Sequence, residues 1–238
     1  MAKELIRFEN ISKSFEGTEV LKDLSLSIHE NEFVTLLGPS GCGKTTTLRI
    51  LGGFEAPDKG RVIFDGCDIT SPPPNKRQLN TVFQKYALFT HMNVAENIAF
   101  GLKIKGKDKA EINEKIAYSL KLVGLEGYET RDPSSLSGGQ QQRIAIARAI
   151  VNEPKVLLLD EPAAGLTPTE VKELTALIRR ISQDFGFAIL LIEHRLDLVM
   201  SISDLIHVQN FGETIAVGTA NEVQNNPLVI EAYLGKEE

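Results

Sequence analysis

The sequence predicts an α/β fold in which a buried parallel sheet is joined to a smaller antiparallel part and carries a helical insert. Residues 4–37 alternate apolar and polar side chains in short runs, which is typical of antiparallel strands. Two fully apolar runs, 156–159 and 187–192, flank a segment with apolar residues at helical spacing, which indicates a βαβ unit. From about 93 to 152 the spacing is helical, which predicts the insert.

The strands and helices can be placed in order from turn and capping residues. A glycine-rich turn after the strand at 33–37 opens a helix over 46–53. Further strands are predicted at 61–65 and 80–84, separated by three consecutive prolines that fit neither a helix interior nor a central strand.

Capping residues mark two later helices. Asp108 and Glu111 predict a capping box, and Gly124 ends that helix. In the βαβ unit, Thr167 and Glu170 predict a second capping box. The remaining predicted elements are strands at 204–209 and 213–217 and short helices over 220–234.

Length and charge limit the classes of function. A chain of 238 residues predicts one domain over 1–238 with a sizeable insert. Its 32 acidic and 26 basic residues give a net charge of -6, so we predict no nucleic-acid partner. The apolar runs are too short to cross a bilayer and the first residues form no apolar signal core, which predicts a cytoplasmic protein. Cys42 and Cys67 show no metal-ligand spacing.

Residues 38–45 match the phosphate-loop pattern GxxxxGK[ST] between a predicted strand and helix. Glycines let backbone N–H groups converge on a phosphate, and the helix N-terminus adds a favourable dipole. Lys44 would balance phosphate charge, and the Thr45 hydroxyl could bind Mg²⁺. The predicted fold is therefore a P-loop NTPase core with an antiparallel β subdomain and an inserted α-helical subdomain. The predicted phosphate-binding residues are Pro39, Ser40, Gly41, Cys42, Gly43, Lys44, Thr45 and Thr46.

Two further segments carry candidate chemistry. Asp160 and Glu161 end a buried strand, where Asp160 could hold Mg²⁺ and Glu161 could polarise an attacking water. Such a pair is often only a solvated turn, but its order after the phosphate loop favours a site. The other segment is Ser137-Gly138-Gly139-Gln140, in which a capping box and two glycines leave a helix N-terminus open to an anion. Two copies packed head to tail would bring this segment to the phosphate loop.

These motifs together resemble the ATP-binding subunit of ABC transporters. Residues 38–45 correspond to Walker A, 136–140 to the signature and 156–161 to Walker B, while Gln84 and His194 correspond to the Q-loop and switch residues. The resemblance implies ATP and Mg²⁺ as cofactors and a head-to-tail dimer, either a homodimer or a paired ATPase subunit. It also implies ATP hydrolysis that powers solute import through integral membrane permease subunits and, indirectly, a solute-binding protein. The expected location is the inner face of the cell membrane, as a peripheral subunit.

The resemblance also assigns roles to single residues. Phe15 would stack on adenine, although a role as core filler stays open, and Gln84 would sense Mg²⁺ or the attacking water. His194 would contact the γ-phosphate. The expected catalytic residues are Glu161, His194, Gln84 and Lys44, and the expected metal ligands are Thr45, Gln84 and Asp160. The expected ATP-binding core spans 1–84 and 153–238, and the helical subdomain spans 85–152.

Two branches of the family are represented along the chain. Residues 1–160 resemble the spermidine/putrescine type, mainly through 82–97 and the uninterrupted LSGGQQQRIAIARAI. Residues 161–238 resemble the branched-chain amino acid type, and Thr167 stands where an aspartate is usual. The apolar residues Tyr86, Leu88, Phe89, Met92 and Val94 either line a groove for a permease helix or pack inside the insert.

Three alternatives follow from the sequence. One is an engineered or recombined chimera that folds and binds nucleotide without productive transport. Another is an ABC-class ATPase of DNA repair or translation, which is disfavoured because zinc cysteines, long coiled coils and a second fused cassette are missing from these 238 residues. A GTPase is disfavoured because the Asn75-Lys76 pair is not followed by the aspartate of NKxD.

Overall fold

The computed structural model describes residues 2–234 and contains two sheets. The larger sheet has six strands in the order β10-β9-β3-β8-β7-β6, and all neighbours are parallel except β9 and β10. Its strands are β3 (Phe33–Leu37), β6 (Leu79–Val82), β7 (Val156–Asp160), β8 (Ala188–Ile192), β9 (Leu205–Asn210) and β10 (Glu213–Gly218). The predicted buried βαβ unit is confirmed as β7, α5 (Pro168–Phe185) and β8.

The smaller sheet is antiparallel, with the strand order β2-β1-β4-β5. Its strands are β1 (Glu4–Phe15), β2 (Thr18–His29), β4 (Lys59–Phe64) and β5 (Cys67–Asp68). The alternation over residues 4–29 is therefore confirmed as antiparallel. For 33–37 the prediction of antiparallel pairing is wrong, because this strand lies between β8 and β9 in the parallel sheet. All five of its residues are buried, as expected for a strand covered on both faces.

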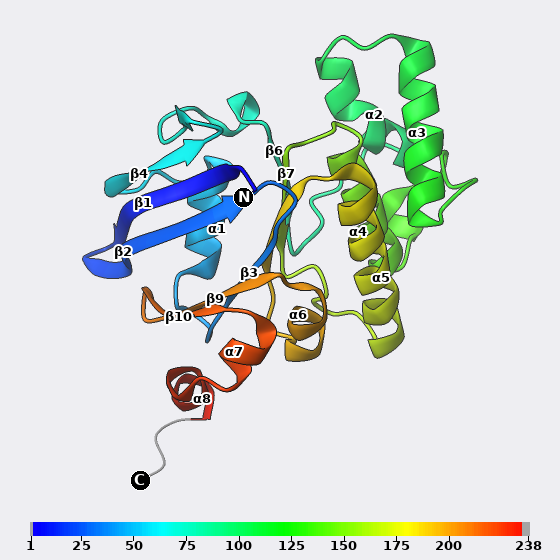
Figure 1. Cartoon of the computed structure of the whole chain (residues 1–238). Coiled ribbons are helices and arrows are strands. Elements are labelled where there is room, and N and C mark those ends of the chain that lie inside the picture. The colour runs from blue at the N-terminus through cyan, green and yellow to red at the C-terminus, as the bar shows by residue number, and fades with distance from the viewer. Residues whose placement is uncertain (1, 235–238) are drawn as a thin grey trace.

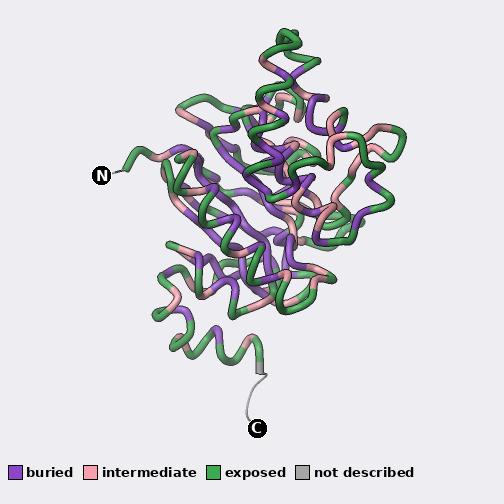
Figure 2. Tube along the Cα trace, turned by 90° about the vertical axis from the view of Figure 1, so that its right-hand side faces the viewer, coloured by how far each residue is buried: buried purple, intermediate pink, exposed green. Residues whose placement is uncertain are grey.

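Helices cover both faces of the parallel sheet (Figure 1). On one face, α1 (Lys44–Gly52) packs between this sheet and the antiparallel sheet in one apolar cluster. On the other face, α4 and α5 join the sheet to the helices of the insert in a second apolar cluster. The helices are α1 (Lys44–Gly52), α2 (Val94–Ile104), α3 (Lys109–Val123), α4 (Gly138–Ile150), α5 (Pro168–Phe185), α6 (Leu196–Ile202), α7 (Ala220–Gln224) and α8 (Pro227–Leu234). Figure 2 shows the buried residues concentrated along the sheets, with exposed residues on the outer helices.

The three predicted N-cap residues all cap their helices, and the predicted capping box forms in two of the three cases. The capping boxes of Ser137 with Gln140 and of Thr167 with Glu170 are confirmed at the starts of α4 and α5. Asp108 caps α3, but the reciprocal bond from the side chain of residue 111 is missing, so that capping box is wrong. The Glu111 carboxylate instead pairs with the ammonium of Lys107 at 2.9 Å. Among the described residues, no helix combines the length and apolar character needed to cross a membrane.

Candidate active site

The phosphate-loop pattern lies where the sequence predicts it, between β3 and α1. Two of its glycines are required by close contacts and by a positive φ. Gly38 has φ 151°, and a Cβ there would lie 2.1 Å from the carbonyl oxygen of Gln209. Gly43 has φ 104°, and a Cβ there would lie 2.5 Å from Leu21 Cδ2. No other residue type fits these positions without moving the backbone.

Lys44 is buried at the start of α1 and turns its ammonium back over the loop. Its Nζ donates to the carbonyl oxygens of Gly38 and Pro39, both at 2.8 Å. Thr45 and Thr46 follow on the first turn of α1, where Thr45 is exposed. The positive charge and the first backbone N–H groups of α1 thus face the same region, which is the arrangement that binds a phosphate.

A hollow of about 360 Å³ joins the phosphate loop to residues from three other parts of the chain. Phe15 lies at its edge with 42% of its surface exposed, and the Lys13 ammonium is 5.1 Å from its ring centroid. The alternative that Phe15 fills the core is therefore excluded. The hollow is lined by Phe15, Val20, Ser40, Gly41, Gly43, Lys44, Thr45, Thr46, Glu161 and His194.

Three of the predicted catalytic side chains meet at the carboxylate of Glu161. Gln84 Nε2 donates to Glu161 Oε2 at 2.7 Å, and His194 Nε2 lies 2.7 Å from Glu161 Oε1. Because an ionised carboxylate only accepts hydrogen bonds, His194 donates from Nε2. Glu161 itself has φ 45°, an uncommon conformation for a residue with a side chain, and its N–H donates to the carbonyl of Ile192 at 2.9 Å. The ends of β6, β7 and β8 thus converge on one carboxylate.

Asp160 precedes Glu161 at the end of β7. Its pKa is raised by burial and by the neighbouring charge of Glu161, against the opposing effects of Arg49, Lys44 and His194. A bound cation would stabilise the ionised form of Asp160, because burial and the nearby carboxylate of Glu161 both disfavour its negative charge. Within residues 2–234, no cluster of three or more His, Cys, Asp or Glu side chains could hold a metal ion. The oxygen atoms of Thr45, Gln84 and Asp160 suit Mg²⁺, which takes few protein ligands when a nucleotide phosphate supplies others.

The signature segment lies apart from the phosphate loop in the single chain. Ser137, Gly139 and Gln140 line a separate hollow of about 290 Å³ beside α5. Gly138 is exposed, and among the described residues the Tyr86 hydroxyl, at 3.4 Å, is the one side-chain group close to a Cβ placed there. Gly139 is buried, and a Cβ there would lie 2.8 Å from Glu170 Oε1. A Cβ at 139 would thus displace the Glu170 side chain at the start of α5, whereas within residues 2–234 no close contact opposes a Cβ at 138.

Arg148, near the end of α4, was not expected from the sequence to act at the site. Its guanidinium donates to the carbonyl oxygens of Tyr86 at 2.9 Å and Ala87 at 2.7 Å. Both of these residues have positive φ, 58° and 48°. Burial lowers the pKa of Arg148. The helix that begins with the signature is thus bonded to the backbone just after Gln84.

Two further residues beside the site were also missed. Glu193 follows β8 and accepts backbone N–H groups on both sides of the Glu161–His194 contact. Tyr233 of α8 hydrogen-bonds the backbone of Gly38, and burial raises its pKa to about 12. A charged residue directly after a fully apolar strand, as at Glu193, is a sequence pattern that could have indicated a residue near the site. Nothing in the sequence places Tyr233 near the phosphate loop.

The apolar residues after Gln84 are only partly available as a groove. Tyr86 and Leu88 pack against the core around the insert, and the Phe89 ring contacts Phe100 in a tilted arrangement with ring centroids 4.6 Å apart. Val94 is fully buried, so its place in a permease-binding groove is wrong. Tyr86, Leu88, Phe89 and Met92 remain half-buried at the surface.

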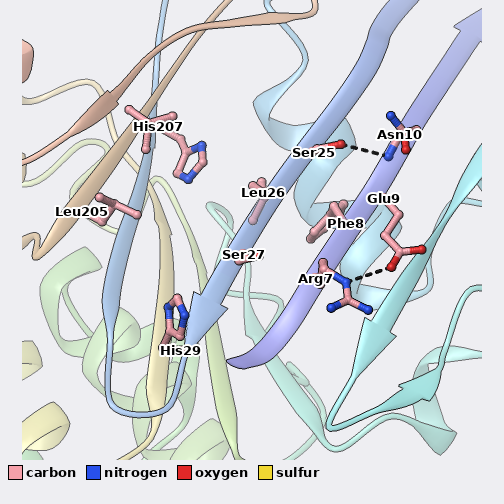
Figure 3. Close-up of a pocket in the computed structure, with 11 residues that line it drawn as sticks. Arg7, Phe8, Glu9, Asn10, Ser25, Leu26, Ser27, His29, Leu205 and His207 are labelled. Carbon is pink, nitrogen blue, oxygen red and sulfur yellow. Dashed lines mark hydrogen bonds and ion pairs between the residues drawn. The ribbon is translucent and has the colours of Figure 1, made fainter. Parts of the chain in front are cut away.

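A different hollow, of about 660 Å³, lies between β2 and β9 (Figure 3). Its Arg7 side chain is already paired with Glu4 and Glu9, and its Ser27 hydroxyl donates to Glu4. His207 is 4% exposed, and burial lowers its pKa to about 4, so its ring is neutral at pH 7. This hollow therefore has no free positive charge for a nucleotide phosphate, unlike the hollow at Lys44.

The loop between β3 and α1 and the carboxylates at the end of β7 define a P-loop nucleotide-binding protein. Residues 21–164 match the family described as ABC transporter, and residues 213–238 match the family described as branched-chain amino acid ATP-binding cassette transporter. The chain belongs to the ABC transporter family, in its ATP-binding part. The resemblance stated from the motifs is thereby confirmed.

Several relatives are named as import proteins. The chain is 54% identical over 227 residues to the spermidine/putrescine import ATP-binding protein PotA of Clostridium novyi, covering 95% of this chain and 65% of that protein. It is 45% identical over 238 residues to PotA of Mesoplasma florum, covering 99% of this chain and 68% of that protein. The chain thus spans about two thirds of the length of these relatives.

Solved structures agree with the fold. The ADP conformation of MJ1267, an ATP-binding cassette of an ABC transporter, matches with a TM-score of 0.88 at 30% identity. The match covers 98% of this chain and 99% of that one. A nucleotide-free ATP-binding cassette from an ABC transporter matches with a TM-score of 0.87, also at 30% identity, covering 98% of this chain and all of that one. The predicted fold class is confirmed.

Proposed function

We propose that this chain is the ATP-binding and ATP-hydrolysing subunit of an ABC importer of the polyamine type. The observation that carries the proposal is the position of Glu161. Its carboxylate is held by Gln84 and His194 at 2.7 Å each, at the wall of the hollow that the phosphate loop also lines. A carboxylate so placed can orient a water toward a phosphate bound by the loop.

The other residues of the hollow have complementary roles. Phe15 offers an exposed ring at the edge for stacking on adenine. Lys44 and the N–H groups of residues 40–46 bind the phosphates, and His194 contacts the γ-phosphate. Bound Mg²⁺ would neutralise phosphate charge. Thr45 and Asp160 would hold it together with the Oε1 of Gln84, whose Nε2 is already used for Glu161.

We propose that two nucleotide-binding subunits pair head to tail, as a homodimer or with a related subunit. The exposed Gly138 and the N-terminus of α4 would then close on the phosphate of the partner copy. Ser137, Gly139 and Gln140 would flank it. The segment 85–152 would act as a helical subdomain, and 1–84 with 153–238 as the ATP-binding core.

The names of the relatives support a partner assignment. Proteins named spermidine/putrescine import ATP-binding proteins match 94% or more of this chain, including the segment after Gln84. We propose that the chain docks permeases of that type at the inner face of the membrane and serves a solute-binding protein indirectly. The tail that matches the branched-chain family supports a second candidate, a chimera that binds nucleotide without productive transport.

The test is an ATPase assay of the purified chain, followed by co-purification with permeases of each type in detergent. We expect Mg²⁺-dependent hydrolysis that EDTA abolishes, and retention by the polyamine-type permease. Hydrolysis without stimulation by either permease would support the chimera. Retention only by the branched-chain type would contradict the partner assignment, and no hydrolysis under any condition would contradict the ATPase assignment.

A further inference from the structure

Glu193 is a buried carboxylate that the proposed function leaves without a role. It directly follows the apolar strand β8 and is only 3% exposed. Its Oε1 accepts the N–H of Ala163 at 3.0 Å, and its Oε2 accepts the N–H groups of His194 at 2.8 Å and Arg195 at 3.1 Å. Three backbone donors thus stabilise the negative charge, which would otherwise be costly to bury.

These bonds connect Glu193 to the backbone next to both Glu161 and His194, which contact each other. Ala163 lies two residues after Glu161, and the His194 ring contacts the Glu161 carboxylate at 2.7 Å. The Glu161 N–H is fixed to the carbonyl of Ile192, the residue before Glu193. The backbone on each side of the Glu161–His194 contact is therefore anchored to one side chain.

The geometry suits a carboxylate and no other side chain of this length. The three N–H groups approach two different oxygens, and an amide offers only one acceptor oxygen while its NH₂ would face a donor. We propose that Glu193 is a positioning residue that holds His194 against Glu161 and ties both to the loop over 162–167. Because that loop leads to the N-cap of α5 at Thr167, Glu193 also links the hydrolytic carboxylate to this helix. The proposal rests on the proposed ATP hydrolysis.

The experiment compares Glu193→Gln with a matched control, Glu32→Gln. The Glu32 carboxylate also accepts a backbone N–H, that of His29 at 2.7 Å, but it lies at the opposite end of β3 from the phosphate loop. For E193Q we expect kcat to fall about tenfold or more, with KM and ATP affinity changed by less than about threefold. E32Q should keep all three values. A kcat of E193Q equal to that of E32Q would overturn the proposal.

A second measurement does not depend on turnover. The chain has four histidines, so the ring signals can be assigned in NMR spectra by single substitutions. The His194 signal should move in E193Q and stay in place in E32Q. If the wild-type protein does not hydrolyse ATP, the proposed function fails, while this signal still tests the contact. An unmoved His194 signal in folded E193Q would refute the positioning role.

A third variant covers the case in which E193Q does not fold. Glu193→Asp keeps the charge but shortens the side chain by one methylene, so it cannot reach the loop at Ala163 and His194 together. We expect a folded protein with normal ATP affinity, lowered kcat and a shifted His194 signal. Wild-type kcat in E193D would contradict the need for both contacts.

Discussion

Glu161→Gln tests the proposed hydrolysis most directly, because it removes the charge while keeping the shape. The carboxylate accepts from Gln84 and His194 at 2.7 Å each, whereas the amide has one acceptor oxygen. One of these bonds to a charged group is therefore lost, which costs about 1.5–3 kcal/mol of stability. The loss of a general base is larger, about 10²- to 10⁴-fold in rate. That range corresponds to about 3–5 kcal/mol in the activation barrier.

The expected loss of stability is smaller than the expected rise in the activation barrier, so the variant should fold but hydrolyse ATP slowly. We expect E161Q to bind ATP, to remain folded and to release phosphate at least about 100-fold more slowly than the wild type. It should also accumulate as an ATP-bound dimer in gel filtration. The assay is steady-state phosphate release together with equilibrium binding of a fluorescent ATP analogue. Glu153→Gln is the control, since Glu153 is exposed and pairs with Lys115 away from the site. Near-normal turnover in E161Q would refute the assignment of Glu161.

Two other variants test separate parts of the site, and a change of pH tests a buried histidine outside it. Lys44→Ala should weaken ATP binding itself by about tenfold or more, measured by equilibrium binding, because it removes the ammonium from the phosphate loop. Gly138→Asp should leave ATP binding by the monomer intact but abolish dimer closure and hydrolysis, because it places a charge at an exposed helix N-terminus where a phosphate must approach. Finally, the free energy of unfolding should fall as the pH drops from about 6.5 to about 4, because the unfolded chain binds a proton that the buried His207 does not. Urea unfolding of the wild type and His207→Phe measures this slope.

Each of these has a contrary result. Unchanged ATP affinity in K44A would remove Lys44 from the phosphate site. Loss of ATP binding by the G138D monomer would show that Gly138 acts within its own chain. A pH slope that is identical in the wild type and H207F would show that His207 does not cause it.

The phosphate loop and the strand-end carboxylates could be predicted because the residues that form them are contiguous in the sequence. The meeting of Gln84, Glu161 and His194 also follows from the sequence, since parallel strands end at the same edge of a sheet. Glu193 and Arg148 could not be assigned, because their partners are backbone groups up to 62 positions away.

The errors have equally local causes. The prediction for residues 33–37 follows the alternation of the preceding strands, although their mainly apolar run is the pattern of a strand covered on both faces. The Asp108 capping box failed because Lys107, the residue before the N-cap, competes for the Glu111 carboxylate. A capping pattern predicts the cap itself better than the return bond.

The bonds from Arg148 to the backbone after Gln84 give α4 the character of a mechanical lever. Its N-terminus carries Gly138, and near its other end Arg148 bonds Tyr86 and Ala87, two and three positions after Gln84. Any rigid rotation of α4 must either drag that backbone along or break two hydrogen bonds to a charged group, at about 1.5–3 kcal/mol each. A displacement of α4 caused by a second copy at Gly138 would thus move the backbone after Gln84 while the helix stays folded. The binding of a partner and the positioning of Gln84 against Glu161 would then occur in the same movement of α4.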